Sequence, residues 1–548
     1  MVRRAFFVDG IECFNTLSLP SPVRFCVLCG SSPSSGYPAG VPGRVTSRRA
    51  VLAGMAALGA AAVLWPYTPK SRRRVPRGGR GRVELTYWEK WTGLEGLALQ
   101  RLVDRFNASQ ERVWVHLIPV GDIDAKAMVA IGGGDPPDLV GLYTYNVPGY
   151  AEARAVMPLD EFVSRGGLQR EGREGERRLE AGTESERGVG GGGSGGRGEG
   201  DGVADAEYAP GVRELLWHEG RQWAGVNTCY TLGLYYNRAM LREVGADAPT
   251  TVAELDAIAD ELTTQDAQGR ITRAGFLQNL PGWWPYLWPA MFGGALFDAG
   301  RNAATVDSPA CVEAFEWIAA TARRRHGVAA TRAFAAAFGR SMHSAQDPFI
   351  SGRLAMIVQG PWLANFIAAL NPALEFGVVP LPVSGALRAS GRVDDANPVG
   401  LLEADVLMIP RGCPHPEEAY EFLRFHQQQR EQEQLALDHF KPSPFAAPSP
   451  EFLARHGHPG IRVHNAIVGS RNAMVLPRTR VWKQYSDLTT AAFDAVWGGA
   501  DVKQTLAGLN ERAQQLIDSA EERRRQRQSG RRGESNEMKT SRWHGGLA

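Results

Sequence analysis

Residues 131–162, IGGGDPPDLVGLYTYNVPGYAEARAVMPLDEF, decide the fold that this chain is expected to adopt. The run LVGL at 139–142 is short, apolar and bounded by turn residues, which predicts a buried parallel strand. Tyr143-Thr-Tyr-Asn146 follows directly and would lie at the carboxyl end of this strand, the edge at which open α/β sheets bind ligands. Aromatic and amide groups there favour a polar, ring-shaped ligand over an anion or a metal. A buried strand with an ordinary tyrosine-rich loop is the alternative.

The pattern outside this stretch alternates strands with helices, which indicates an α/β fold. Residues 97–106 have an apolar stripe at helical spacing, and Thr251-Val-Ala-Glu254 is a capping box that opens a second helix. Pro416 is well placed as the first residue of a third helix, with acidic residues in its first turn. The residues expected to face the core are Ala98, Leu102, Val103 and Phe106 in the first helix and Val252, Leu255, Ile258 and Leu262 in the second.

Several short motifs occur in an order that resembles the extracellular solute-binding proteins (family 1) of sugar ABC importers, of the maltose-binding type. They are GGGDPPD at 132–138, YAE at 150–152, MPLD at 157–160, LTYWEKWTG at 85–93, LQRLVDRFN at 99–107, LYYN at 234–237, AMIVQGPW at 355–362, MIP at 408–410 and HPEEAYEFL at 415–423. Each motif alone is weak, and their common order carries the resemblance. It covers about residues 83–523, which is most of the chain.

The resemblance implies a periplasmic-binding-protein-like type II fold, with two α/β lobes and a ligand cleft between them. Lobe one would comprise residues 83–229 and 398–455, and lobe two would comprise residues 230–397 and 456–523. The chain would cross between the lobes near 227–231, near 397–400 and again around 450–465. A chain of 548 residues also exceeds what one hydrophobic core usually serves, so more than one domain is expected on length alone.

The flanking and inserted segments have a different composition. Residues 1–45 are interpreted as a disordered or wrongly assigned leader, with translation expected to start near Val41 or Val45. Residues 46–82 contain paired arginines, an apolar run at 50–65 and a basic linker, which resembles a twin-arginine export signal or an uncleaved membrane anchor. The Gly/Arg/Glu-rich insert at 165–206 and the tail at 524–548 have few apolar residues, so both are expected to be disordered.

Composition excludes several other functions. A net charge of +2 gives no field that would attract nucleic acid. The pair Cys26-x-x-Cys29 has no second pair and no nearby histidine, and a solvated loop explains His456, His458 and His464 better than a zinc site does. We therefore expect no metal, no cofactor and a monomeric protein.

Aromatic residues gather where the resemblance places the cleft, and they suggest the ligand class. Sugars bind by stacking their C–H faces on aromatic rings while amides and carboxylates hold the hydroxyl groups. Trp362, which follows Gly360-Pro361, matches a position at which sugar-binding members of the family place a stacking tryptophan. The residues expected to bind the ligand are Trp362, Trp283, Trp284, Tyr143, Tyr145, Asn146, Tyr230, Trp91, Glu89, Glu403, Trp482 and Tyr485. Trp288 is expected in the core instead.

Two carboxylates in this set, Glu89 and Glu403, keep an enzymatic alternative open. A glycoside hydrolase needs two carboxyl groups at about 5 Å or at about 6.5–9.5 Å. No hydrolase pattern surrounds either residue, so no catalytic residue is assigned. Glu403 and Ala404 also stand where many family members carry a glycine pair, so the sugar that those members bind does not carry over to this chain.

The expected function is capture of a mono- or oligosaccharide by hinge closure, outside the cytoplasm, and delivery to ABC permease subunits. The protein would be periplasmic or on the cell surface, with membrane association through residues 50–65 if the export signal is not cleaved. A membrane-tethered sugar sensor and a binding protein for a non-sugar solute are the alternatives.

Overall fold

The structure is a computed structural model, and it describes residues 81–162, 207–324, 327–338 and 342–544. The leader, the export signal and the Gly-rich insert lie outside these residues. Among the described helices, none is both long and apolar enough to cross a membrane.

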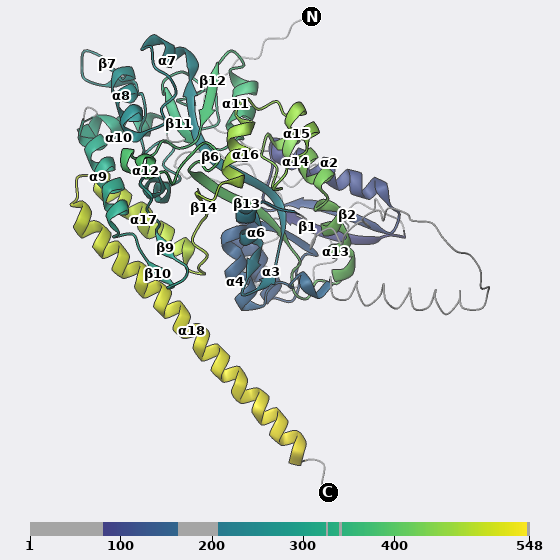
Figure 1. Ribbon diagram of the computed structural model, residues 1–548. Helices are drawn as coiled ribbons and strands as arrows, with labels where there is room; N and C mark the ends of the chain where they lie inside the picture. The colour runs from purple at the N-terminus through teal and green to yellow at the C-terminus, as the bar shows by residue number, and fades with distance from the viewer. Residues whose placement is uncertain (1–80, 163–206, 325–326, 339–341, 545–548) are drawn as a thin grey trace, which may run out of the picture. The chain divides into compact units, whose positions relative to one another are not determined.

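One eight-stranded sheet organises the described chain (Figure 1), and six of its strands run in the order β11-β6-β13-β3-β1-β2. β12 also pairs with β6, and β14 pairs with β13. The strands are β1 (Val83–Glu89), β2 (Val113–Pro119), β3 (Leu139–Tyr143), β6 (Gly225–Asn237), β11 (Met356–Gln359), β12 (Phe376–Val379), β13 (Gly400–Met408) and β14 (Ala473–Met474). Three two-stranded sheets complete the β-structure: β4 (Trp217–His218) with β5 (Arg221–Gln222), β7 (Thr264–Gln265) with β8 (Ile271–Arg273), and β9 (Phe297–Asp298) with β10 (Ala303–Ala304).

The strand expected at 139–142 is confirmed as β3. Residues 139–142 are all buried, and β3 pairs in parallel with β1 through Tyr87 and Leu139. Its other neighbour, β13, is antiparallel, with Asp405 opposite Tyr143. The carboxyl end of β3 therefore lies beside a buried acidic residue that the sequence pattern did not connect with it.

Two long strands, β6 and β13, join the two halves of the sheet. Residues 225–232 of β6 pair with β13, whereas residues 233–237 pair with β11 on one side and β12 on the other. All nine residues of β13 are buried. The boundaries expected between lobes near 227–231 and 397–400 fall on or beside these strands, and the individual lobe boundaries stay a prediction.

The predicted helices form as expected. The stripe at 97–106 belongs to α2, the capping box at Thr251 opens α8, and Pro416 begins α13. Each residue named for the core face of the first two helices is buried. The helices of the first part are α2 (Gly93–Ser109), α3 (Ile123–Gly132), η2 (Thr144–Asn146), α4 (Val147–Ala153), α6 (Pro210–Leu216), α7 (Arg238–Glu243), α8 (Val252–Leu262), η3 (Pro285–Phe292), α9 (Pro309–Arg324) and α10 (Gly327–Phe338). Those that follow are α11 (Leu363–Leu370), α12 (Gly385–Ala389), α13 (Pro416–His426), α14 (Gln429–His439), α15 (Pro450–Arg455), α16 (Ile461–Gly469), α17 (Trp482–Trp497) and α18 (Val502–His544).

Three large hydrophobic clusters hold these elements together. The largest surrounds the second part of β6 and contains residues of α8, η3, α9, β11, α17 and α18. Two others lie on opposite faces of the sheet, because alternate residues of one strand fall in different clusters: Val406 and Met408 in one, Leu407 and Ile409 in the other. Trp288 is buried in the largest cluster, as expected.

The tail expected to be disordered from 524 is instead helical as far as His544, as part of α18 (Figure 1). Its polar composition suggested disorder, but arginine, glutamine and glutamate are good helix formers. The helix begins inside the core, where Leu506, Leu509 and Ala513 are buried, and so continues from an already nucleated turn.

His458 and His464 are buried, which corrects the expectation of a solvated loop. The Nδ1 of His458 accepts from the N–H of Gly460 (2.8 Å), so its Nε2–H donates to the Tyr235 hydroxyl (2.9 Å). Tyr235 then donates to Nε2 of His464 (3.0 Å), and Nδ1 of His464 donates to Thr231 (2.8 Å). This chain of hydrogen bonds is complete only when both rings are neutral, and it ties α16 to β6.

Acidification should therefore weaken the fold through these histidines. Burial lowers the pKa of His458 to about 3 and lowers that of His464 well below its ordinary value near 6.5. Between these values the unfolded chain binds protons that the folded chain does not, so stability present above pH 6.5 is lost as the pH falls toward 3. Each histidine adds up to about 1.4 kcal/mol per pH unit to the slope.

We expect His458→Gln to show a shallower loss of unfolding free energy between pH 7 and pH 5 than the wild type, as measured by urea denaturation. His415→Gln, at the N-cap of α13, is the control and should keep the wild-type slope. Equal slopes in all three proteins would contradict the assignment of this acid sensitivity to the buried histidines.

Candidate ligand-binding site

A cavity of about 540 Å³ lies where the carboxyl ends of β1 and β3 meet β6, β13 and the segment after β11. Its lining is made of aromatic rings and charged side chains. The lining residues are Lys90, Trp91, Thr92, Gly93, Leu94, Glu95, Tyr143, Tyr230, Trp283, His343, Trp362, Asn365, Phe366, Asp405 and Lys441. Five of the residues expected to bind the ligand are among them: Trp91, Tyr143, Tyr230, Trp283 and Trp362.

One aromatic wall comes from the part of the chain after β6. Trp362 packs edge-on against Tyr230, with ring centroids 5.3 Å apart, and Trp283 packs edge-on against His343 at 5.4 Å. His343 in turn stacks on Phe366 at 4.4 Å. Trp283 is 42% exposed, as expected for a ring held on a turn-rich loop. These rings line the cavity, and Trp362 and Phe366 also pack against the largest hydrophobic cluster.

Glycine at position 360 is required by the conformation of Trp362. A Cβ atom at Gly360 would lie 2.2 Å from the indole ring of Trp362, far inside van der Waals contact. The motif Gly360-Pro361-Trp362 therefore folds the ring back over the end of β11, where it lines the cavity. The sequence motif and the orientation of the tryptophan have the same steric cause.

Trp91 lines the cavity, but its ring is mostly covered by neighbouring side chains. The ammonium groups of Lys90 and Lys441 lie 4.8 Å and 4.5 Å from the centroid of its ring, and His439 packs edge-on at 4.9 Å. The ring is only 8% exposed. Trp91 therefore holds two cations in place by cation–π attraction and offers little free surface to a ligand.

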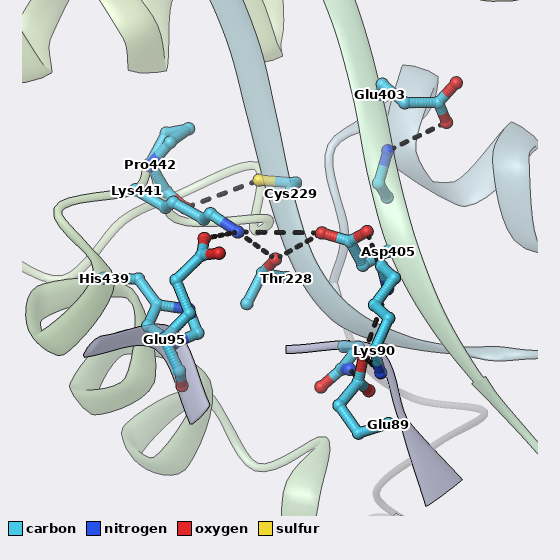
Figure 2. Close-up of polar contacts among 12 residues, drawn as sticks. Glu89, Lys90, Glu95, Thr228, Cys229, Glu403, Asp405, His439, Lys441 and Pro442 are labelled. Carbon is cyan, nitrogen blue, oxygen red and sulfur yellow. Dashed lines mark hydrogen bonds and ion pairs between the residues drawn. The ribbon is translucent and has the colours of Figure 1, made fainter. Parts of the chain in front are cut away.

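The charged side of the cavity is a network in which cations and anions alternate (Figure 2). Lys441 bridges Glu95 (3.2 Å) and Asp405 (3.6 Å), and it also donates to the Thr228 hydroxyl (3.1 Å). Lys90 contacts the other oxygen of Asp405 (3.0 Å). Each charge in the network therefore has an opposite charge beside it.

The pKa shifts in this network follow from these pairs. Burial alone would raise the pKa of Asp405, but Lys90 and Lys441 outweigh burial and lower it. Burial would likewise raise the pKa of Glu95, yet Lys441 and His439 lower it. For Lys90, burial acts to lower the pKa, and Asp405 and Glu89 raise it. These three side chains are charged at neutral pH.

Glu89 was expected to bind the ligand. It is instead buried, and other residues of the protein occupy the hydrogen-bonding positions of its carboxylate. Its carboxylate accepts from Tyr87 (2.8 Å), from Asn227 (2.7 Å) and from both the backbone and the ammonium of Lys90 (2.8 and 3.2 Å). A Cβ atom at position 141 would lie 1.8 Å from this carboxylate, so Gly141 of β3 makes room for it. Glu89 positions Lys90 and does not line the cavity.

Tyr145 and Asn146 lie behind the cavity wall. Tyr145 stacks on Tyr143, with ring centroids 5.2 Å apart, and donates its hydroxyl to Asp124 (2.9 Å). Asn146 donates to the other oxygen of Asp124 (2.9 Å). Asp124 therefore anchors the loop after β3 and so fixes the ring of Tyr143.

Glu403 lies beside the cavity and does not line it. It is 1% exposed, and its cross-strand partner on β6 is the cavity residue Tyr230. One carboxyl oxygen accepts from the backbone N–H of Ala404 (3.0 Å), and the other has no hydrogen-bond partner among the described residues. Burial raises the pKa of Glu403 to about 8, so the carboxyl group is neutral at pH 7.

The remaining three expected residues do not line the cavity either. Trp284 packs behind Trp283 and Trp362, at 5.3 Å and 6.2 Å between ring centroids. Trp482 and Tyr485, on α17, are buried in the largest hydrophobic cluster. The helical spacing and apolar neighbours of these two residues are typical of core packing. We therefore do not include Trp482 and Tyr485 in the proposed site.

Several lining residues were missed from the sequence. Lys441 and Asp405 are buried and charged, and neither occurs in a recognisable motif. One signal was present: β13 is an apolar run interrupted only by Glu403 and Asp405, two residues apart on one face. A buried strand with two carboxyl groups on one face usually borders a site or an ion pair. Among the described residues, no group of His, Cys, Asp or Glu could hold a metal ion.

Comparison with known proteins identifies the family. The model of the bacterial extracellular solute-binding protein family matches residues 101–451, more than half of the chain. The chain belongs to this family, and the resemblance drawn from the sequence motifs is confirmed. By its description, the family is extracellular and binds solutes.

Three relatives illustrate the match. A maltotriose-binding protein of Pyrococcus abyssi is 22% identical over 362 residues, which is 66% of this chain and 66% of that protein, just under two thirds. The solved structure of CpMnBP1 with mannotriose bound has a TM-score of 0.61 and 22% identity, and the match covers 79% of this chain and all of that one. An ABC substrate-binding protein of Listeria monocytogenes, in complex with cycloalternan, has a TM-score of 0.61 at 18% identity, covering 80% and 99% of the two chains. The structural matches confirm the type II fold with two α/β lobes.

Replacement of Asp405 by asparagine should strongly destabilise the protein. The substitution leaves the buried ammonium groups of Lys90 and Lys441 facing an amide that cannot neutralise them. Removal of one partner from a buried ion pair typically costs about 3–5 kcal/mol. Urea denaturation at pH 7 would measure this loss. The control Asp487→Asn, which removes a surface pair with Lys483, should change the stability little. Equal effects of the two substitutions would show that the buried network does not stabilise the fold.

Proposed function

We propose that the protein captures a neutral mono- or oligosaccharide in the 540 Å³ cavity, outside the cytoplasm, and delivers it to an ABC permease. The observation that carries this proposal is the combination of lining groups. Six Trp, Tyr and Phe rings and a histidine surround a set of charges that neutralise one another. The relatives support the same ligand class, because their names describe maltotriose, mannotriose and cycloalternan as ligands.

The aromatic wall suits the apolar faces of a sugar ring. Trp362 and Trp283 present indole surface to the cavity, and Trp283 is held there with much of its ring exposed. Burial of such rings against the C–H face of a pyranose removes apolar surface from water. The hydroxyl groups on the rim of the sugar would then face the polar side of the cavity, where Glu95 and Lys90 offer an acceptor and a donor.

The charge of the lining favours a neutral ligand over an anionic solute. Two lysines, Lys90 and Lys441, face two carboxylates, Glu95 and Asp405, and each ammonium is already paired. A phosphate or carboxylate ligand would have to displace one of these carboxylates. A sugar hydroxyl group, in contrast, can form a hydrogen bond with a lysine or carboxylate that stays in its ion pair. This balance argues for a sugar against the alternative of a non-sugar anion such as a polyol phosphate.

The same charges argue against glycoside hydrolysis. That reaction needs one carboxyl group that is protonated at the working pH and placed against the glycosidic oxygen. Both carboxyl groups that line the cavity, Glu95 and Asp405, have lowered pKa values and are ionised. The neutral carboxyl group of Glu403 is buried outside the lining. We therefore assign binding without chemistry, and no catalytic residue.

Hinge closure and delivery complete the proposal. β6 and β13 are shared by both halves of the sheet, so bending of these strands would bring the aromatic wall toward the charged side of the cavity. Export through the twin-arginine segment and docking of the loaded form on permease subunits would follow. Residues 50–65 would tether the protein to the membrane if the signal is not cleaved.

Trp362→Ala should weaken sugar binding by about 2 kcal/mol, roughly thirtyfold, because it removes an aromatic anchor from the cavity. Trp283→Ala should have a smaller effect in the same direction, since this ring is more exposed. Isothermal titration calorimetry with a panel of mono-, di- and trisaccharides, including maltotriose and mannotriose, would measure both. The control is Trp114→Ala, a partly exposed tryptophan on β2 that is not part of the cavity lining.

Three results would contradict the proposal. Affinities that are the same in Trp362→Ala, Trp114→Ala and the wild type would place the sugar elsewhere. A shortened oligosaccharide, detected by chromatography of the ligand recovered after incubation, would overturn the assignment of binding without chemistry. Absence of binding across the whole panel would remove the sugar from the proposal.

A further inference from the structure

Glu403 combines three properties that few carboxyl groups share. It is buried, one of its oxygens has no hydrogen-bond partner among the described residues, and no cation lies within ion-pair distance in that part of the chain. Figure 2 shows its carboxyl group set apart from the network of Lys90, Asp405 and Lys441, with a dashed line only to the backbone nitrogen of the next residue. Its one hydrogen bond in the described chain, from the backbone N–H of Ala404, leaves the carboxyl group without a charged partner.

Its position connects it with the ligand site. Glu403 and Asp405 lie two residues apart on β13, so their side chains leave the same face of the strand, and Asp405 lines the cavity. Across the ladder, the partner of Glu403 is Tyr230, which lines the cavity and packs against Trp362. Glu403 therefore lies next to two lining residues, Tyr230 and Asp405, without lining the cavity itself.

The groups that face Glu403 come from several elements. They are Tyr230 of β6, Tyr145 of η2, Tyr286 of η3, Asp405 of β13 and Arg478 in the segment after β14. Arg478 is the one cation of this set, and it lies close enough to attract Glu403 electrostatically without forming an ion pair with it. The surroundings are thus mostly aromatic and weakly stabilising for a negative charge.

We propose that Glu403 is a positioning residue of the ligand site, which acts through Tyr230 and must be neutral for the sugar to bind tightly. This inference rests on the proposed function. A sugar in the cavity displaces water from Tyr230 and Tyr143, and the surroundings of Glu403 then become less able to stabilise an ionised carboxylate. The bound state therefore holds the proton on Glu403 more tightly than the free state does. An ionised Glu403 would also repel the ionised Asp405 on the same face of the strand.

Linkage gives the sign and size of the effect. Because binding raises the pKa of Glu403 further, the sugar complex takes up a proton, and the affinity falls as the pH rises through the pKa of the free protein, about 8. Between pH 6 and pH 9 this amounts to a loss of about tenfold when the complex stays protonated throughout. The pKa values of four other groups near the site are shifted away from pH 8: that of Tyr143 is raised to about 12, those of Asp405 and Glu95 are lowered, and burial lowers that of His343.

The test is isothermal titration calorimetry of the full chain with maltotriose and mannotriose as probes at pH 6, 7, 8 and 9. Each measurement is repeated in two buffers of different ionisation enthalpy, which reports the number of protons taken up on binding. The proteins compared are the wild type, Glu403→Gln and Glu431→Gln. Glutamine mimics the neutral carboxyl group and cannot ionise, and Glu431 is a buried glutamate paired with Arg105, outside the cavity lining.

We expect the ratio of affinities at pH 6 and pH 9 to be about ten for the wild type and for Glu431→Gln, with uptake of a fraction of a proton near pH 8. For Glu403→Gln the ratio should be close to one, with no proton uptake near pH 8. Each ratio is taken within one protein, so a general loss of affinity caused by the substitution does not affect it.

Three outcomes would overturn the inference. Equal pH profiles in Glu403→Gln and the wild type would show that Glu403 is not linked to binding, while the proposed sugar binding would stand. An affinity that rises with pH would mean that binding brings Arg478 onto an ionised Glu403, the opposite coupling. Absence of binding by both probes at every pH would remove these two sugars from the proposed function and the inference with them.

Discussion

The antiparallel pairing of β6 with β13 is the constraint on which the rest of this structure depends. Residues 225–232 pair with residues 401–407, and the same two strands continue into the pairings that define each half of the sheet. This ladder connects the two halves of the sheet and contributes lining residues to the cavity. Thr228 and Tyr230 of β6 and Asp405 of β13 contribute either to the lining or to the charged network behind it. A shift of one residue in this ladder would turn Asp405 and Tyr230 to the opposite face and abolish the site.

Two carboxyl groups on a completely buried strand present an electrostatic problem, and the protein solves it in two ways. Asp405 stays ionised because Lys90 and Lys441 lie against its two oxygens and Thr228 donates to one of them (3.0 Å). Glu403, two residues away, has no such partner and is neutral instead. The first solution fixes a rigid polar surface, because every charge holds its neighbour in place. The second leaves a buried carboxyl group without a charged partner, so its ionisation depends on its surroundings.

Sequence reasoning succeeded where local chemistry decides the structure. The strand at 139–142, the capping box at Thr251 and the helix that begins at Pro416 all depend on residues within a few positions of each other, and all are present. The cavity position of Trp362 also follows from a local cause, the glycine two residues earlier. Failures occurred where the deciding partner is remote in sequence. The carboxylate of Glu89 accepts a hydrogen bond from Asn227, 138 residues away, and that of Asp124 accepts hydrogen bonds from Tyr145 and Asn146. No spacing rule connects Lys441 with Glu95, although this pair forms one side of the site.

The aromatic residues show a second limit of sequence reasoning: residue type alone does not distinguish a ring that lines the cavity from a ring that fills the core. Trp362, Trp283 and Trp482 look alike as residues that could stack on a sugar, but only the first two line the cavity. Trp482 occurs on a regular amphipathic helix, where an aromatic residue is placed by the core that the helix covers. Trp362 and Trp283 occur beside glycine and proline in irregular backbone, and both line the cavity, although Trp362 also packs against the largest hydrophobic cluster. Indole surface that such backbone leaves exposed costs hydrophobic free energy, and a ligand that covers it recovers that free energy on binding. Irregular backbone around an aromatic residue is therefore a better indication of a binding surface than the presence of the aromatic residue itself.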